Sequence, residues 1–220
     1  MSGHETRRRG ETGVYDWWSR HPRLLDAFYT FVFFGREARI RRRAVEALDL
    51  TSGDRVLDLG SGTGTAFEPL RERVGSEGTV VGVDASTGMT RRAAERVRER
   101  GWTNVHVVRG DATRLPLSDR SFDAVHAAMS LSAMPDPVAA VAAAHDVLRP
   151  GGRLAVLDAQ PFQHWPMKLL NPVLVPLFRA TTNWVPEADL PAAIDCRFDD
   201  ARVTEFTDGT LFVAAARRGQ

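Results

Sequence analysis

The 220-residue sequence has little of several features, and each scarcity excludes a class of protein. Its one cysteine, Cys196, rules out an internal disulfide framework and fits a reducing compartment. No apolar run approaches the ~18 residues that a membrane span requires. The first 13 residues carry charge but no apolar core, unlike a secretory signal. We therefore expect a cytoplasmic protein that at most lies on a membrane surface.

A large net charge of either sign is also missing. Lysine and arginine total 29, and aspartate and glutamate total 28, which leaves a net charge of +1. This balance gives no electrostatic reason to expect nucleic acid as a partner. With 43% hydrophobic residues, the chain is long enough for one sizeable core. The sequence predicts one domain, with no bound metal and no nucleic acid.

Changes of pattern divide the chain into a tail and four parts of one domain. Residues 1–13 are polar and aperiodic, which predicts a flexible tail before a single domain over 14–220. Apolar residues at spacings of three and four then predict extra N-terminal helices over 14–50. The other parts are an alternating core over 55–160, an apolar insertion over 161–190, and a C-terminal helix and hairpin over 191–220.

Short β-rich runs alternate with helical segments in the core. Runs such as Arg55–Leu59 are apolar on both faces, which is typical of parallel strands covered by helices on each side. Near the end of the chain, Asp208-Gly209 joins two alternating segments and suits a type I′ turn, which predicts an antiparallel hairpin. We predict an α/β fold with a Rossmann-like, doubly wound sheet, mostly parallel, with helices on both faces. The helices predicted between the core strands cover Phe67–Val74, Met89–Arg100 and Val138–Leu148.

The stretch VLDLGSGTG, Val56–Gly64, places a glycine-rich turn directly after the first predicted strand. Such a turn before a helix exposes backbone N–H groups at the crevice where open α/β sheets bind ligands. Gly60, Gly62 and Gly64 follow the pattern G-x-G-x-G. Thr65 stands where the dinucleotide fingerprint has its last glycine. The loop therefore predicts a ligand-binding turn that departs from the dinucleotide pattern.

Acidic residues stand at the ends of three predicted strands. Asp84 ends the second strand and can accept hydrogen bonds from two ribose hydroxyls, and Asp111 follows the third and can accept from an exocyclic amine. Asp58 precedes the turn, where it favours a nearby cation and would repel a pyrophosphate. A ligand with an ammonium, a ribose and an adenine satisfies all three, which predicts S-adenosylmethionine. The alternatives are that Asp58 caps the N–H groups of its own loop and that the other two are solvated strand ends.

Five motifs stand in the order of a known family: VLDLGSGTG, VVGVDAS, GDATRLPLSDRSFDAV, MPDP and LRPGGRLAVLD. Over about Arg55–Ala159 the chain resembles the class I S-adenosylmethionine-dependent methyltransferases, within them the branch of ubiquinone/menaquinone-biosynthesis and phospholipid-amine methyltransferases. The resemblance implies that the glycine loop holds the methionine part, the second strand end the ribose, and the third the adenine. The implied cofactor-binding residues are Asp58, Gly60, Ser61, Gly62, Asp84, Ala85, Met89, Asp111, Ala112 and Met129.

Methyl transfer makes modest demands on acid–base groups. The sulfonium donor is already activated, so the protein mainly aligns the nucleophile with the methyl group, and a base is needed only if the acceptor loses a proton. Many relatives carry histidines after the fourth strand, where this chain has Ser132 and Ala133. The catalytic residue stays unassigned, with Tyr15 and His164 as candidates. Relatives often close the cofactor pocket with an aromatic residue from the region of Tyr15.

Four further residues carry groups that could act in catalysis. His126 lies in a strand expected to be buried and His145 at the edge of a helical face, so both are interpreted as packed histidines. Asp158 follows the fifth strand, at the edge where substrate should enter, and Tyr29 could approach from the N-terminal helices. None of the four is assigned a role.

Two segments outside the common core, 15–35 and 161–184, are rich in apolar and aromatic residues. The second follows the fifth strand, at the edge where a substrate lid would lie. Ordinary packing is the alternative for any one residue. Together the segments predict a small-molecule or lipid-like apolar acceptor, such as a quinone or a lipid amine. The arginines of Arg36–Arg43 could contact anionic lipid head groups, or form a solvated helix face.

Two other functions stay open at this point. One is a non-catalytic S-adenosylmethionine-binding partner subunit, which the missing histidines keep open. The other is a nicotinamide-dependent oxidoreductase, which Thr65, Asp58 and the terminal hairpin disfavour. Lys168 is the single lysine, which leaves no tyrosine-lysine pair for that chemistry. The sequence predicts no particular oligomeric state.

Overall fold

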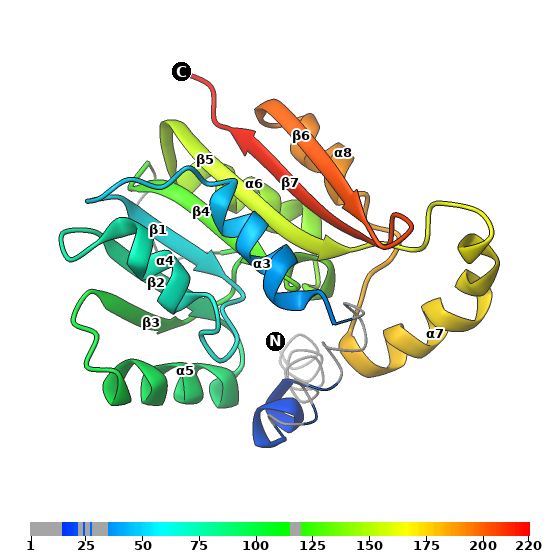
Figure 1. Cartoon of the computed structure of the whole chain (residues 1–220), viewed down its shortest axis with the longest axis horizontal. Helices are drawn as coiled ribbons and strands as arrows, with labels where there is room; N and C mark the ends of the chain where they lie inside the picture. Colours follow the sequence, from blue (N-terminus) through cyan, green and yellow to red (C-terminus); the bar gives the residue numbers. More distant parts are fainter. Residues whose placement is uncertain (1–14, 22–23, 25–26, 28–34, 115–119) are drawn as a thin grey trace, which may run out of the picture.

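Seven strands form one sheet at the centre of the computed structural model (Figure 1). The structure describes residues 15–21, 24, 27, 35–114 and 120–220. The predicted tail, Tyr29 and most of the apolar positions of the first N-terminal segment lie outside these residues. Residues 15–20 are helical.

The strands have the order β3-β2-β1-β4-β5-β7-β6. β1 to β5 are parallel, and β7 pairs antiparallel with both β5 and β6. This arrangement confirms the predicted mostly parallel sheet with a terminal hairpin. The order reverses between β1 and β4, and open α/β sheets bind ligands at the carboxyl ends of the strands beside such a reversal. The strands are β1 (Arg55–Leu59), β2 (Thr79–Asp84), β3 (Val105–Arg109), β4 (Phe122–Ala128), β5 (Leu148–Ala159), β6 (Asp199–Phe206) and β7 (Leu211–Arg217).

Helices cover both faces of the sheet, as predicted. α3 and α4 pack with α5 against one face, and α6 and α8 pack against the other (Figure 1). α4 has the predicted bounds. α5 and α6 begin slightly earlier than predicted, because Ser86 and Asp136 cap them by accepting backbone hydrogen bonds. The helices are α3 (Glu37–Glu46), α4 (Phe67–Val74), α5 (Thr87–Glu99), η1 (Leu131–Ala133), α6 (Pro137–Val147), η2 (Met167–Leu170), α7 (Asn171–Thr182) and α8 (Leu190–Asp195).

The inner strands have buried side chains on both faces. In β1, Val56 packs on the side of α3 and α4, whereas Leu57 packs on the side of α6. In β4, Ala124 and Val125 divide between the two sides in the same way. Burial on both faces is why these strands are almost continuously apolar in sequence.

The turn between β6 and β7 has the predicted position. The N–H of Thr210 donates to the carbonyl of Thr207 at 3.2 Å, and the two central residues, Asp208 and Gly209, have φ angles of 53° and 76°. A type I′ turn requires positive φ at both central positions. The Asp-Gly pair therefore fixes the hairpin as the sequence indicated.

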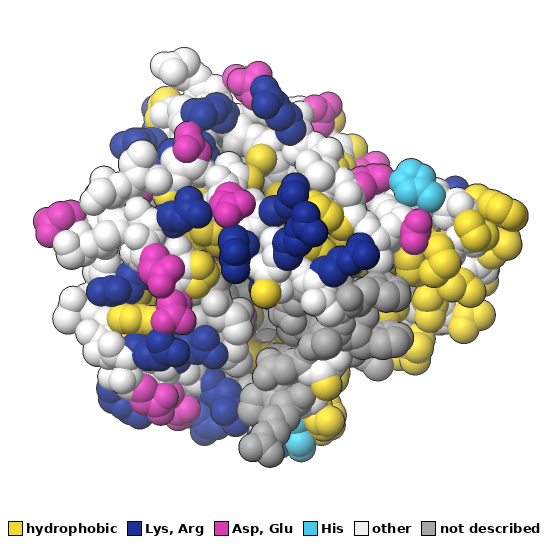
Figure 2. Space-filling view, in the orientation of Figure 1, with side chains coloured by type: hydrophobic (Ala, Val, Ile, Leu, Met, Phe, Trp, Pro, Cys, Tyr) yellow, Lys and Arg dark blue, Asp and Glu magenta, His cyan; other side chains and the backbone are white. Residues whose placement is uncertain are grey.

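The insertion over 161–190 contains η2 and α7, which extend beyond the sheet on the side of β5 (Figure 1). In the space-filling view, hydrophobic side chains gather over α7, whereas arginines gather over α3 (Figure 2). None of the helices that the structure describes combines the length and the apolar character that a bilayer-spanning helix needs.

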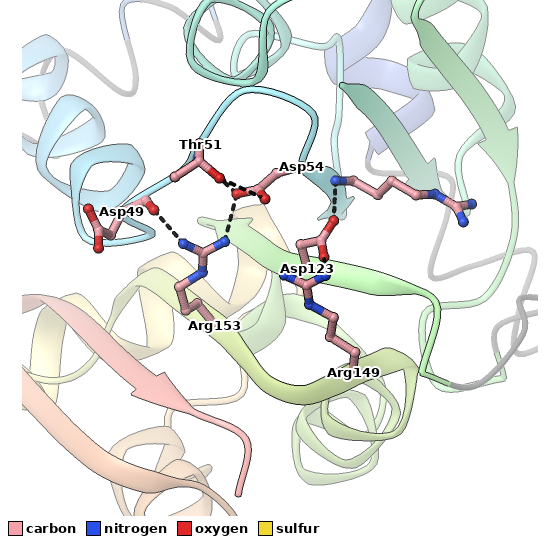
Figure 3. Close-up of polar contacts among 7 residues, drawn as sticks. Asp49, Thr51, Asp54, Asp123, Arg149 and Arg153 are labelled. Atoms are coloured by element: carbon pink, nitrogen blue, oxygen red, sulfur yellow. Dashed lines mark hydrogen bonds and ion pairs between the residues drawn. The ribbon is translucent and has the colours of Figure 1, made fainter. Parts of the chain in front are cut away.

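A polar network ties β1, β4 and β5 together at the amino ends of the strands (Figure 3). Asp54, just before β1, pairs with Arg153 of β5 at 2.6 Å and accepts from the N–H of Thr51 at 2.9 Å. Burial raises the pKa of Asp54, but the contacts with Thr51 and Arg153 outweigh it and hold the pKa below its ordinary value. Asp123 of β4 pairs with Arg149 at 2.5 Å. The network leaves the opposite, carboxyl edge of the sheet for the ligand.

Candidate functional site

A glycine-rich loop joins β1 to α4 at the carboxyl edge of the sheet. Gly60, Gly62 and Gly64 have positive φ angles of 65°, 55° and 75°, which glycine adopts at little cost. A Cβ at Gly60 would lie 2.4 Å from the Cβ of Ser130, whereas a Cβ at Gly62 would meet nothing within 4 Å among the described residues. The hydroxyl of Ser61 is buried and has no partner in the described part of the chain. The loop therefore leaves open space at Gly62, where a ligand can approach the backbone.

Asp84, at the end of β2, holds this loop. Its Oδ2 accepts from the N–H of Gly62 at 2.9 Å, and its Oδ1 accepts from the N–H of Ser86 at 2.8 Å. Burial raises the pKa of Asp84, the two hydrogen bonds oppose the rise, and the charges of Asp58 and Asp16 add to it. Capping of the loop by Asp58 was one alternative from the sequence. In the structure, the carboxylate that accepts from the N–H of Gly62 belongs to Asp84 and not to Asp58.

Asp58 is buried below the loop and pairs with a histidine of the neighbouring strand. Its Oδ1 lies 2.7 Å from Nδ1 of His126, its register partner in β4. Both side chains are at most 3% exposed. Oδ2 of Asp58 and Nε2 of His126 have no hydrogen-bond partner among the described residues. Because buried polar atoms normally have partners, the pair keeps an acceptor for a group that this part of the protein does not supply.

The residues predicted for the adenine lie at the ends of β2 and β3. Asp111 follows β3, and its Oδ1 accepts from the N–H of Thr113 at 2.9 Å and from the hydroxyl at 2.6 Å. This turn fixes the carboxylate at the edge of the sheet. Ala112 and Met89 are buried, and Ala85, directly after β2, is exposed.

The segment after β4 forms the other side of the site. Met129 has a φ of 55°, a conformation that few residues other than glycine adopt, and its N–H donates to the carbonyl of Leu157 at 2.7 Å. Asp158 is fully buried and accepts from the N–H and the hydroxyl of Ser132 at 3.0 Å and 2.5 Å. Burial raises the pKa of Asp158, although these hydrogen bonds oppose the rise. Asp158 therefore positions η1, the turn that contains Ser132 and Ala133.

The two catalytic candidates lie in different places. The hydroxyl of Tyr15 donates to the carbonyl of Thr182, at the end of α7, at 2.6 Å. Nε2 of His164 lies 3.0 Å from a carboxylate oxygen of Glu205 in β6, and His164 is exposed. Since β6 is four strands from β1, His164 lies roughly 19 Å from the glycine loop by strand spacing. The structure does not bring the two candidates together.

One residue at this edge, Asp16, was not predicted from the sequence. Its Oδ1 accepts from the hydroxyl of Ser86 at 2.5 Å and from the N–H of Gly88 at 3.0 Å, at the start of α5. No local spacing links residues that lie 70 positions apart. Here a cavity of about 230 Å³ is lined by Asp16, Ser19, Arg20, Thr87, Gly88 and Arg91. Within the described ranges, no group of three histidine, cysteine or acidic side chains could hold a metal ion.

Known proteins share this sequence pattern. The family described as a methyltransferase domain matches residues 56–152. The chain is 36% identical over 159 residues to the aklanonic acid methyltransferase DauC of Streptomyces sp. (strain C5), covering 72% of each. It is 31% identical over 159 residues to the demethylmenaquinone methyltransferase of Geobacillus kaustophilus (strain HTA426), covering 72% of this chain and 67% of the relative. The chain belongs to the class I S-adenosylmethionine-dependent methyltransferases.

The fold of this methyltransferase agrees with the assignment. Phosphoethanolamine N-methyltransferase 2 of Haemonchus contortus, solved in complex with S-adenosyl-L-methionine, matches with a TM-score of 0.64 at 17% identity, over 78% of this chain and 50% of that one. The predicted family, enzyme class and cofactor are confirmed: the protein is a methyltransferase that uses S-adenosylmethionine. The nicotinamide-dependent and non-catalytic alternatives are thereby set aside.

The residues of the methyltransferase at this edge fit the cofactor. Oδ2 of Asp58 and the hydroxyl of Ser61 are buried polar atoms without partners among the described residues, and Gly62 borders open space. Carboxylates at two neighbouring strand ends, Asp84 and Asp111, suit hydroxyl and amine donors and not a phosphate. When bound, S-adenosylmethionine supplies an activated methyl group.

Proposed function

We propose that this methyltransferase acts on a quinone or a similarly apolar ring compound, at a ring carbon or oxygen. The observation that carries the proposal is the similarity to the demethylmenaquinone methyltransferase, whose name states a quinone acceptor. The aklanonic acid methyltransferase likewise has a small organic molecule as its named acceptor. A quinone of this kind with an apolar tail belongs in a lipid bilayer, so peripheral membrane contact is part of the proposal.

The insertion supports an apolar acceptor because it returns to the site with aromatic side chains. The N–H of Val185 donates to the carbonyl of Ser132 in η1 at 2.7 Å. Beside it, the indole N–H of Trp184 donates to the carbonyl of Ala159 at 3.2 Å, and the ring of Phe178 packs edge-on against Trp184 at 6.2 Å. Trp184 is buried, whereas the ring of Phe178 is half-buried and keeps exposed aromatic surface that an apolar ring can contact.

For the cofactor we propose the roles that the family pattern implies. Asp84 accepts from the ribose hydroxyls, Asp111 faces the adenine amine, and Ala112 and Met89 pack against the ring. The glycine loop, with Asp58 below it, holds the methionine part. These contacts serve alignment, since an in-line displacement needs the nucleophile at about 3 Å from the methyl group.

Tyr15 has better support than His164 as a residue that closes the site. Tyr15 directly precedes Asp16, whose carboxylate accepts from Ser86 at the start of α5. Ser86 lies two residues after Asp84, the proposed ribose acid. Its hydroxyl donates to Thr182 at 2.6 Å, so its contact is with the insertion. We propose Tyr15 as a positioning residue between the cofactor side and the acceptor side.

The test uses purified protein, S-adenosylmethionine with a labelled methyl group, and a reduced demethylnaphthoquinone with a short prenyl chain. Label should appear in the quinone fraction, and Asp84→Ala should abolish it. A parallel reaction with phosphatidylethanolamine covers the lipid-amine alternative. If the protein binds S-adenosylhomocysteine but labels the lipid amine, or neither acceptor, the proposed quinone acceptor is wrong.

A further inference from the structure

α7 presents much less polar surface to water than a surface helix normally does, since Arg179 is its one charged side chain. Val173 and Leu177, four positions apart on one face, are 70% and 55% exposed. On the inner side, Leu174 and Phe178 are only half-buried. The outer face is completed by three further exposed residues without a charge or a hydrogen-bonding side chain, Pro172, Pro176 and Ala180.

The exposed apolar surface continues into the segment before α7. Trp165 is 80% exposed, and the two leucines of η2 are 67% and 42% exposed. Figure 2 shows the hydrophobic side chains as one area over α7. Single exposed apolar residues are ordinary, but a contiguous patch marks an interaction site. The α7 apolar patch consists of Trp165, Leu169, Leu170, Val173 and Leu177.

The charges of this segment have one sign. Residues 159–186 contain no aspartate or glutamate, although the chain has 28 acidic residues. The two charged side chains in the stretch are Lys168 and Arg179. Arg179 pairs with Glu187 at 2.7 Å, and Lys168 is exposed between residues of the patch. Because Glu187 offsets the charge of Arg179, the positive charge of this surface comes from Lys168. An apolar surface that carries a lysine and has no carboxylate within residues 159–186 is complementary to an anionic lipid surface.

We propose that the α7 apolar patch docks this methyltransferase on an anionic membrane surface. Trp165 suits the boundary between head groups and acyl chains, where its indole has both apolar and polar neighbours. Val173 and Leu177 reach the acyl boundary, and Lys168 meets the phosphates. The inference rests on the proposed quinone acceptor and names the lipid bilayer as the place from which the enzyme takes that acceptor.

The connections of the segment relate the docked surface to the site. One end of α7 is held by the hydrogen bond from Tyr15 to Thr182, and the residues that follow it reach η1 through Val185 and Ser132. Docking through α7 therefore brings the acceptor side of the site to the lipid. The arginines over α3 form a separate area of the surface (Figure 2).

The experiment is co-sedimentation of the full chain with vesicles of phosphatidylcholine alone or with a third of it replaced by phosphatidylglycerol. The double variant Val173→Asp/Leu177→Asp changes two exposed side chains. Val138→Asp/Val203→Asp is the matched control, because it also adds two carboxylates, at side chains of α6 and β6 that are 50% and 43% exposed and lie outside the patch. Wild type should bind the anionic vesicles, the double variant should bind about tenfold less, and the control should match wild type.

The proposal is overturned if wild type binds neither vesicle, or if the double variant binds as well as wild type. It is also overturned if the patch joins two copies of the chain, seen as a dimer that the double variant dissociates. Calorimetry with S-adenosylhomocysteine must give equal affinity for both proteins, which shows that the variant is folded. Vesicle binding without quinone methylation would refute the proposed acceptor and leave the docking surface standing.

Discussion

Asp58→Asn tests whether the buried negative charge below the glycine loop attracts the ammonium group of the cofactor. Asparagine keeps the size of the side chain, and its oxygen can still accept from Nδ1 of His126, which lies 2.7 Å from Oδ1 in the wild type. A charge-assisted hydrogen bond is stronger than a neutral one, so the free energy of unfolding should fall by about 1 kcal/mol. The variant should therefore stay folded.

The effect on the ligand is expected to be larger than the effect on the fold. Two unit charges about 5 Å apart interact by about 3 kcal/mol at an effective dielectric constant of about 20. Screening by the loop and the solvent should leave about 1–2 kcal/mol of this attraction. The Kd for S-adenosylhomocysteine should then rise by about five- to thirtyfold.

The assay compares two ligands by calorimetry. S-adenosylhomocysteine carries the ammonium, whereas 5′-methylthioadenosine keeps the nucleoside and the thioether but lacks the amino-acid part. Only the first should lose affinity in Asp58→Asn. Asp195→Asn is the matched control, because it removes one carboxylate from the exposed end of α8.

Two results would refute the reasoning. If the Kd for S-adenosylhomocysteine is unchanged, the charge of Asp58 does not act on the ligand. If both ligands lose affinity equally, the substitution has distorted the loop, and the role of Asp58 is to shape the nucleoside site.

Three further predictions concern the network, the loop and pH. Arg153→Met leaves the buried Asp54 carboxylate without its cation and should lower the free energy of unfolding by about 3 kcal/mol in a denaturant titration. The affinity for the cofactor should not change. Arg149 is exposed, so Arg149→Met should lower the free energy of unfolding by less than about 1 kcal/mol. Gly62→Ala places a Cβ in the open space at a φ of 55° and should lower the free energy of unfolding by only about 1 kcal/mol. It should weaken the affinity for S-adenosylhomocysteine by at least about tenfold. An unchanged affinity would mean that the ligand binds elsewhere. Because the pKa of Asp84 is raised, affinity should fall as pH drops through that pKa, and Asp84→Asn should remove this dependence. The free energy of unfolding of the ligand-free protein should depend on pH in the opposite direction. A carboxyl group whose pKa is raised in the folded state stabilises the fold at pH values below its ordinary pKa. This stabilisation is lost as the pH rises through the raised pKa.

Features with a local physical cause could be predicted from the sequence. The bounds of α4 follow from apolar spacing and from Gly75, which ends the helix with a φ of 69°. The final turn follows from the positive φ that Asp208-Gly209 tolerates. The acids at the ends of β2 and β3 were found because a parallel sheet collects the ends of its strands at one edge.

Contacts between distant residues could not be predicted in the same way. The bond from Ser86 to Asp16 depends on where the N-terminal helix packs, and no pattern within either segment encodes it. The pairing of Asp58 with His126 depends on the register of β1 against β4. α7 escaped notice because it contains Pro176, which normally marks the end of a helix.

Tyr15 and Asp16 are neighbours in the chain, but they form hydrogen bonds with two different helical segments. One is bonded to the end of α7 at Thr182, and the other to the start of α5 at Ser86. A single peptide unit thus connects the end of α7, on the proposed acceptor side, with the start of α5, beside the proposed ribose acid Asp84. By thermodynamic linkage, any factor by which the bound acceptor changes the affinity for the cofactor equals the factor by which the bound cofactor changes the affinity for the acceptor.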